Sequence, residues 1–267
     1  MVKYNKVYDS IYGVLIMNIK DIQVNKLLNA GLEKGVDPDK YSKDLKDYHM
    51  CLWENRTLKS KPFKLESGYL NRMIFNDGEH EIVFTPDSIT NISQNSKRKY
   101  KSKPESEIVK DYCNDISVKE LVDRFNEIDY TIGSSIIYPI SIDNKSIGWT
   151  LNRARGVLYK IHDRIDLTLE CIRRYYNNEQ SVNPLLSSII KNKLFFDLFS
   201  GFKEYVDFFF LNDLVDVDYN VLPLFGSVCF DTPFPDSIEE YKIYVKNTIS
   251  FVEKRNARID RWVKEWK

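Results

Sequence analysis

The chain has 267 residues, and its 39 basic and 39 acidic side chains give a formal net charge of zero at pH 7. Hydrophobic residues make up 43% and aromatic residues 13% of the chain, which is typical of a globular protein with a substantial core. The balanced charge excludes a global field that favours nucleic acid or an anionic membrane, so any nucleic-acid role would have to be local.

The first segment predicts an N-terminal helical extension over residues 1–36. Apolar residues recur at helical spacing up to Leu32, and Gly35 followed by Asp37-Pro38 is a stop signal and a turn. The only continuous apolar run near the start is short, and no small-residue cleavage site follows it, which argues against a secretory signal. Charged residues interrupt the longest later apolar stretch, 195–217, and exclude an ordinary membrane span. We therefore expect a cytoplasmic protein.

The cysteines and histidines predict no metal site. The four cysteines are far apart in the chain, no CxxC pair occurs, and the three histidines are scattered. This spacing fits neither a disulfide framework nor a zinc ribbon. We expect reduced and mostly buried thiols.

The next part of the chain predicts a short helix and then a small antiparallel sheet. The helix is expected over residues 40–53. Strand-like runs and turn signals follow in residues 60–90, where Asn76-Asp77-Gly78 is the strongest turn signal. Residues 128–140 are rich in β-branched and aromatic residues and complete the expected sheet.

The last third of the chain predicts helices. Asn183-Pro184 is expected to begin a helix that ends before Gly201, and residues 202–214 are expected to form the second helix of a hairpin. Ser237 and Glu240 form a capping box that opens a long final helix. Its apolar stripe, interrupted near Asn256, indicates a helix packed across the domain, or alternatively a helical interface between two chains.

Arginine is concentrated in one place. Five of the twelve arginines lie between Arg153 and Arg174, although the chain otherwise prefers lysine. Such a local preference indicates positions that need a planar, bidentate guanidinium. From Lys160 to Tyr176 the apolar residues have helical spacing, which places carboxylates and guanidiniums together on another face. One interpretation is a ladder of ion pairs on the helix surface, with Glu170 paired to Arg173 or Arg174.

The other interpretation is an anion-binding site. A bend at Gly156 would fold the preceding arginines back over the start of the helix, and guanidiniums at a helix N-terminus suit a phosphate or a carboxylate. The predicted ligand-binding residues are Asn152, Arg153, Arg155, Arg164 and Arg173. The predicted catalytic residues, as general bases or metal ligands, are Asp163, Asp166 and Glu170.

A longer pattern resembles an uncharacterised bacterial family, a domain of unknown function. It comprises YTIG at 130–133, TxNxxRG at 150–156 and IxDRxDLTLExIRRxY at 161–176. The resemblance covers roughly residues 37–262 and implies a single domain, a bacterial origin and cytoplasmic residence. The resemblance implies no reaction, cofactor or catalytic residue. The sequence also contains no P-loop, Rossmann or zincin fingerprint.

The sequence thus predicts an α+β fold, a mostly helical single domain over 1–267 with a small antiparallel sheet and a long C-terminal helix. The leading hypothesis is a protein that binds or acts on a phosphorylated or nucleotide-like small molecule through the Arg/Asp cluster at 152–174. One alternative is a non-enzymatic interaction or oligomerising protein, in which the final helix or the basic tract 95–103 meets a partner. The other is a nucleic-acid-directed toxin or phage-defence effector, whose binding would fall steeply with salt.

Overall fold

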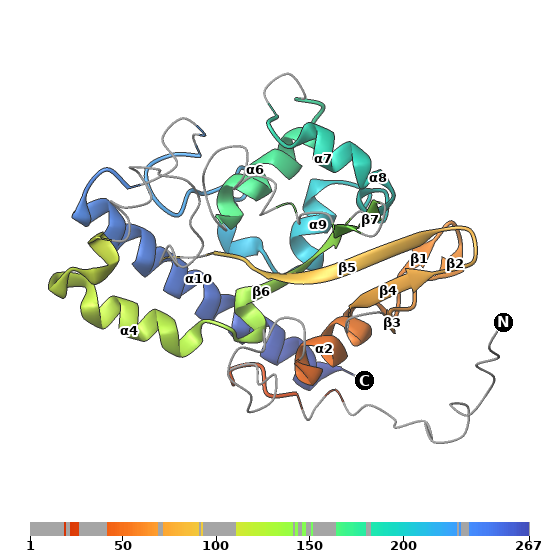
Figure 1. Cartoon of the computed structure of the whole chain (residues 1–267), viewed down its shortest axis with the longest axis horizontal. Helices are drawn as coiled ribbons and strands as arrows, with labels where there is room; N and C mark the ends of the chain where they lie inside the picture. The colour runs from red at the N-terminus through yellow and green to blue at the C-terminus, as the bar shows by residue number, and fades with distance from the viewer. Residues whose placement is uncertain are drawn as a thin grey trace.

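The computed structural model describes residues 19, 22–26, 42–68, 72–90, 92, 111–140, 142–143, 146–147, 151, 164–179, 183–228, 230 and 235–266. Figure 1 shows helices around a small sheet. The α-helices are α2 (Lys43–Trp53), α4 (Lys119–Ile128), α6 (Ile165–Tyr176), α7 (Leu186–Lys191), α8 (Lys193–Phe196), α9 (Phe202–Phe208) and α10 (Ile238–Glu265). Short 3₁₀ helices are η3 (Ile116–Val118), η4 (Ile132–Ser134) and η6 (Asn212–Leu214).

The strands pair only in antiparallel fashion within the described ranges. The largest sheet has the order β3 (Glu66–Ser67), β4 (Met73–Asn76), β5 (Glu81–Ser88), β6 (Ser135–Ile140). Two hairpins accompany it: β1 (Thr57–Leu58) with β2 (Lys61–Pro62), and β7 (Ile142–Asp143) with β8 (Ser146–Ile147). The predicted turn joins β4 to β5, and its Gly78 adopts a φ of 87° that glycine tolerates. The α+β fold with a small antiparallel sheet is confirmed.

The core is aromatic. Trp53 of α2 is fully buried, and its ring lies within 6.2 Å, centroid to centroid, of a group of phenylalanines. They are Phe63, Phe84, Phe195, Phe199, Phe208 and Phe209. These rings bring the sheet, α8 and α9 together. Most of this group comes from the phenylalanine-rich segment 195–210, so a single stretch of sequence supplies much of the core.

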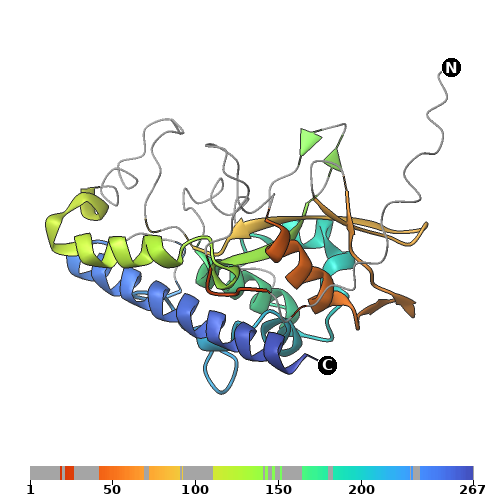
Figure 2. The same cartoon turned by 90° about the horizontal axis from the view of Figure 1, so that it is seen from below.

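The long C-terminal helix runs beside α4, as two perpendicular views show (Figures 1 and 2). The Ser237 hydroxyl accepts a hydrogen bond from the Glu240 amide at 3.2 Å, and the Glu240 carboxylate accepts one from the Asp236 amide at 2.8 Å. The predicted helix start is therefore correct. The apolar stripe is buried against α4, η4 and η6, at Tyr241, Val245, Ile249, Val252, Ile259 and Val263. Packing within one chain thus accounts for it.

The predicted helical hairpin is shorter and more broken than expected. The first helix divides into α7 and α8 at Asn192, whose backbone has a φ of −107° and a ψ of 25° and whose side-chain amide donates to the Ser188 carbonyl at 2.9 Å. The second helix ends at Phe208, because Phe210 adopts a left-handed φ of 56°. Local side-chain and backbone geometry therefore overrides the helical periodicity in this region.

Candidate functional site

The predicted site residues divide into two groups in the structure. Four of them lie outside the described residues, so the approach of their side chains to the helix remains a prediction: Asn152, Arg153, Arg155 and Asp163. The other four lie on α6 or immediately before it: Arg164, Asp166, Glu170 and Arg173. These four do not form one cluster of free charges. They belong to two separate ion-pair arrangements.

The first arrangement is a buried pair at the start of α6. Arg164 Nε donates to Asp166 Oδ1 at 3.0 Å, and a second nitrogen of the same guanidinium donates to Oδ2. Asp166 Oδ2 also accepts the backbone N–H of Leu224 at 2.9 Å, and the guanidinium lies 4.3 Å from the ring centre of Phe225. Both charged side chains are buried. Their contacts fix the start of α6 against residues 224–225, which is a structural role.

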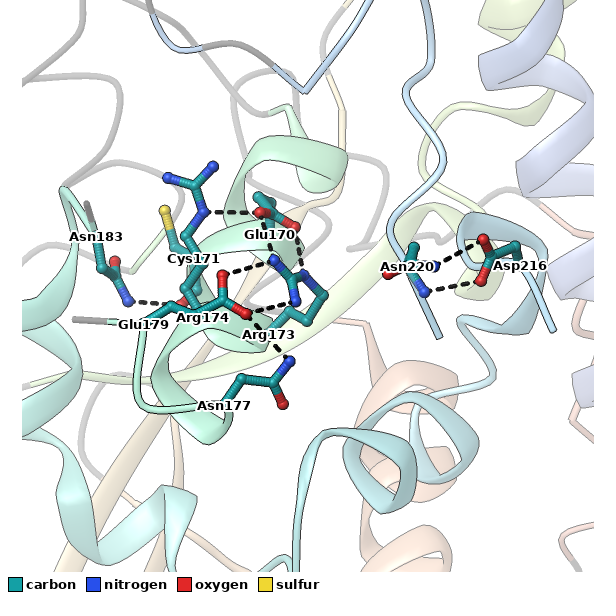
Figure 3. Close-up of polar contacts among 9 residues, drawn as sticks. All are labelled: Glu170, Cys171, Arg173, Arg174, Asn177, Glu179, Asn183, Asp216 and Asn220. Atoms are coloured by element: carbon teal, nitrogen blue, oxygen red, sulfur yellow. Dashed lines mark hydrogen bonds and ion pairs between the residues drawn. The ribbon is translucent and has the colours of Figure 1, made fainter. Parts of the chain in front are cut away.

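The second arrangement lies at the C-terminal end of α6 (Figure 3). Arg173 donates to Glu170 through Nε at 2.8 Å and Nη2 at 3.0 Å, and to Glu179 through Nη1 and Nη2 at 2.9 Å each. Arg174 Nε donates to the same Glu170 at 2.7 Å. These hydrogen bonds raise the pKa of Arg173 and lower the pKa of Glu179. Two carboxylates and two guanidiniums therefore balance each other.

This network has the spacing of the predicted ion-pair ladder but a different environment. Glu170 contacts Arg173 at i+3 and Arg174 at i+4, as helix geometry requires. The Glu170 side chain is only 5% exposed, so the network is largely buried rather than solvated. A carboxylate held by two guanidiniums in this way positions the helix end and is poorly placed to act as a general base.

Beside the network lies an open cleft of about 590 Å³. It is bounded by the end of α6, the start of α9 and the loop 216–220, and Arg173 forms part of its wall. The lining residues are Arg173, Asn177, Ser200, Gly201, Phe202, Lys203, Glu204, Asp207, Asp218, Tyr219 and Asn220. Sequence reasoning found only Arg173 among them. For the other lining residues, the sequence offered two signals: Gly201 at the helix boundary, and the acidic residues Asp213, Asp216 and Asp218.

The side chains across the cleft are linked to one another. Lys203 Nζ lies 3.2 Å from an Asp207 carboxylate oxygen and 4.2 Å from the ring centre of Tyr219, and it donates to the Tyr219 hydroxyl. That hydroxyl donates to Asp207 at 3.2 Å. Cation, carboxylate and phenol therefore form one connected polar surface.

The loop that carries Tyr219 is held in an uncommon conformation. Tyr219 has a left-handed φ of 62°, which is unusual for a bulky residue. Asp216 supports it by accepting a hydrogen bond from the Asp218 amide at 2.9 Å. It also accepts hydrogen bonds from the backbone amide of Asn220 at 2.8 Å and from the Asn220 side chain at 3.0 Å (Figure 3). Strained backbone of this kind concentrates at binding sites, where the surrounding structure maintains it.

A group with metal-ligand spacing lies elsewhere, at the β4–β5 turn. Asp77, Glu79 and His80 offer ligand atoms within 4.8 Å of one another. Lys61 Nζ is 3.6 Å from Asp77 and 3.2 Å from Glu79, so an ammonium already balances these carboxylates. Backbone hydrogen bonds from Glu79 and His80 lower the pKa of Asp77. Lys61 and the backbone amides thus stabilise the turn without a metal ion, and the turn supplies no argument for a metal centre.

Comparisons with known proteins add a family but no activity. No curated protein and no solved structure matches the chain significantly. Among the described residues, no helix combines the length and the apolar character needed to cross a membrane. A family model matches residues 21–259. The match begins before residue 37, where the resemblance was expected to start, and it includes the whole cleft. The chain belongs to this family of unknown function (DUF6994).

Proposed function

We propose that this is a cytoplasmic protein that binds a phosphorylated or nucleotide-like small molecule in the cleft between α6 and α9. The observation that carries the proposal is the cleft itself, whose wall combines Arg173 and Lys203 with carboxylates, amides and an aromatic ring. Its volume of about 590 Å³ is in the range of small-molecule sites. The cleft thus extends the predicted Arg/Asp cluster toward residues 200–220.

The two cations of the cleft have different roles in this proposal. Arg173 is engaged by Glu170 and Glu179 through all three of its nitrogen atoms, so it is a fixed part of the wall. Lys203 has an exposed i,i+4 pair with Asp207, with side-chain exposures of 67% and 44%, and an exposed contact with Tyr219. Exposed pairs are worth about 0–1 kcal/mol, so Lys203 can turn to a phosphate at little cost.

The uncharged part of such a ligand would meet the remaining groups. Glu204 and Asp207 present carboxylate oxygens that accept hydrogen bonds from sugar hydroxyls, and Asn177 and Asn220 present amides. The Tyr219 ring provides a flat apolar surface. Asp166 and Glu170 have positioning roles in this proposal, because both are buried and bound to guanidiniums.

The test is a thermal-shift panel of nucleotides, sugar phosphates and inorganic phosphate. We expect one ligand class to raise the melting temperature, since a ligand at 100 times its Kd adds about 2.7 kcal/mol to the stability. Lys203→Gln should abolish the shift, because it removes the mobile cation. The matched control is Lys193→Gln, since Lys193 has the same i,i+4 pairing with Asp197 and a similar exposure of 62% but does not line the cleft.

Two results would contradict the proposal. One is a panel in which no ligand changes the melting temperature of the unsubstituted protein. The other is a shift that Lys203→Gln and Lys193→Gln reduce equally, since such a shift would come from general charge rather than from the cleft.

A further inference from the structure

Arg255, in the middle of α10, is a fully buried cation. Its Nε donates to the Phe209 carbonyl at 3.0 Å, and Nη1 donates to the carbonyls of Gly133 at 2.8 Å and Ser135 at 2.7 Å. Its third nitrogen, Nη2, is buried and has no hydrogen-bond partner among the described residues. Carbonyl oxygens satisfy N–H groups but carry no net charge. In the described part of the protein, no carboxylate forms an ion pair with this guanidinium.

Other buried polar groups interact with the same guanidinium. Tyr48 and His49 of α2 and Tyr205 of α9 are fully buried, and each interacts electrostatically with Arg255. The two tyrosine hydroxyls and both imidazole nitrogens have no hydrogen-bond partner among the described groups. The Tyr48 and His49 rings are 4.8 Å apart. Tyr205 lies 4.9 Å from the ring of Phe209, whose carbonyl binds Arg255.

These groups are neutral around a permanent charge. Burial, with the nearby guanidinium adding to it, lowers the pKa of His49 to about 3. Burial raises the pKa of Tyr48 to about 12 and raises that of Tyr205 as well, despite the opposing effect of Arg255. Arginine does not deprotonate in proteins. A buried charge without a counter-charge and buried donors without acceptors are both strongly unfavourable.

We propose that a small monovalent anion of halide size is bound beside Arg255 Nη2, held by the hydroxyls of Tyr48 and Tyr205 and by His49. One guanidinium balances one negative charge, which favours a monovalent anion over a phosphate dianion. The free atoms are mainly N–H and O–H donors, as an anion requires. Because the whole group is buried, the anion is enclosed as the protein folds and stabilises the native state. This site is separate from the cleft, so either proposal can fail alone.

The test compares urea unfolding in sodium chloride and in sodium gluconate at equal ionic strength. Gluconate is too large for a halide-sized site, so the unfolding midpoint should be higher in chloride. Tyr205→Phe should lower the midpoint in chloride and remove most of the difference between the salts. The matched control is Tyr176→Phe, whose hydroxyl donates to the Phe196 carbonyl at 2.8 Å: it should lose stability equally in both salts.

Each outcome decides the question. A Tyr205→Phe variant that is more stable than the unsubstituted protein would mean that the hydroxyl has no partner at all, which overturns the proposal. A variant that loses the same stability in both salts would indicate bound water rather than an anion. Crystals grown in bromide should show an anomalous peak beside Arg255 Nη2, and its absence would also overturn the proposal.

Discussion

Two buried arginines show how single residues determine the electrostatics of this protein. Arg164 is paired with Asp166, so the charge that it brings into the core is neutralised within the chain. Among the described residues, the acceptors of Arg255 are all backbone carbonyls, which carry no net charge. The consequence extends to His49, which is buried and whose pKa the charge of Arg255 helps to lower.

We expect His49 to make the protein less stable in acid. The pKa of His49 is about 3 in the folded protein, whereas the ordinary value of 6.5 applies to the unfolded chain. Between these pH values, the unfolded state therefore binds a proton that the folded state does not bind. The free energy of unfolding should therefore fall as the pH is lowered through this window, by up to about 1.4 kcal/mol per pH unit. Urea unfolding of the unsubstituted protein and His49→Leu, from pH 7.5 to pH 4.5, measures the slope.

Asp129 acts in the opposite direction and must be separated from His49. Burial raises its pKa to about 6, so it favours the folded state as the pH falls from 6 toward 3.8. The difference between the unsubstituted protein and His49→Leu cancels this contribution. Gluconate buffer is the appropriate medium, because an anion beside Arg255 would favour imidazolium. Equal slopes for the two proteins would refute the assignment to His49.

At the scale of the elements, α10 depends on a well-formed start. Ser237 and Glu240 satisfy backbone N–H groups that have no partner within the helix. The helix then continues for 28 residues, and its apolar face contacts α4, η4 and η6. A weakened cap therefore also affects α4, η4 and η6, because these elements pack against α10.

Ser237→Ala should lower the free energy of unfolding by about 1 kcal/mol, the usual cost of losing such a cap. Ser187→Ala serves as the control, since Ser187 is exposed within α7, where alanine is a better helix former. Chemical unfolding followed by circular dichroism measures both. If the two substitutions have the same effect, the cap does not stabilise the helix.

At the scale of the whole molecule, Gly133 marks a close approach between the sheet region and the C-terminal helix. The Gly133 amide donates to Asn256 Oδ1 at 2.7 Å, and the Asn256 side-chain amide donates to the Thr131 hydroxyl at 2.9 Å. A Cβ at position 133 would lie 2.9 Å from the Asn256 backbone nitrogen and even closer to its Oδ1. A backbone atom within a helix cannot easily move away to relieve this contact.

Gly133→Ala should therefore destabilise the protein by about 1–3 kcal/mol, as overpacking does. In Gly201→Ala the new Cβ meets nothing within 4 Å, and the φ of 173° suits any residue, so that control should stay within about 1 kcal/mol. Thermal unfolding distinguishes them. Similar losses for both variants would show that the approach of α10 to η4 can relax.

Elements governed by local signals were predictable from the sequence. The spacing of Ile165, Leu169 and Ile172 predicted α6, and the 76–78 turn predicted the β4–β5 hairpin. The pairing of Glu170 with Arg173 and Arg174 also followed from helix geometry. These interactions join residues within four positions of each other, where periodicity determines the neighbours.

The cleft and the Arg255 region could not be predicted in this way, because tertiary packing creates them. Arg173 meets Lys203 and Tyr219 only through the packing of α6 beside α9. For Arg255 a signal was present, since the polar pair Arg255-Asn256 interrupts the apolar stripe of α10. A polar interruption on a buried helix face indicates side chains with partners elsewhere, but it does not identify them.

The contacts of Arg255 also limit how early the protein can finish folding during translation. Its guanidinium binds the Ser135 carbonyl across 120 residues of sequence. At about 5–20 residues per second, β6 leaves the ribosome roughly 6–24 s before Arg255 does. In the folded protein, β6 is buried on both faces. During that interval it therefore lacks its contact with Arg255 of α10. Nascent chains stalled before residue 255 should consequently engage chaperones that recognise exposed apolar strands.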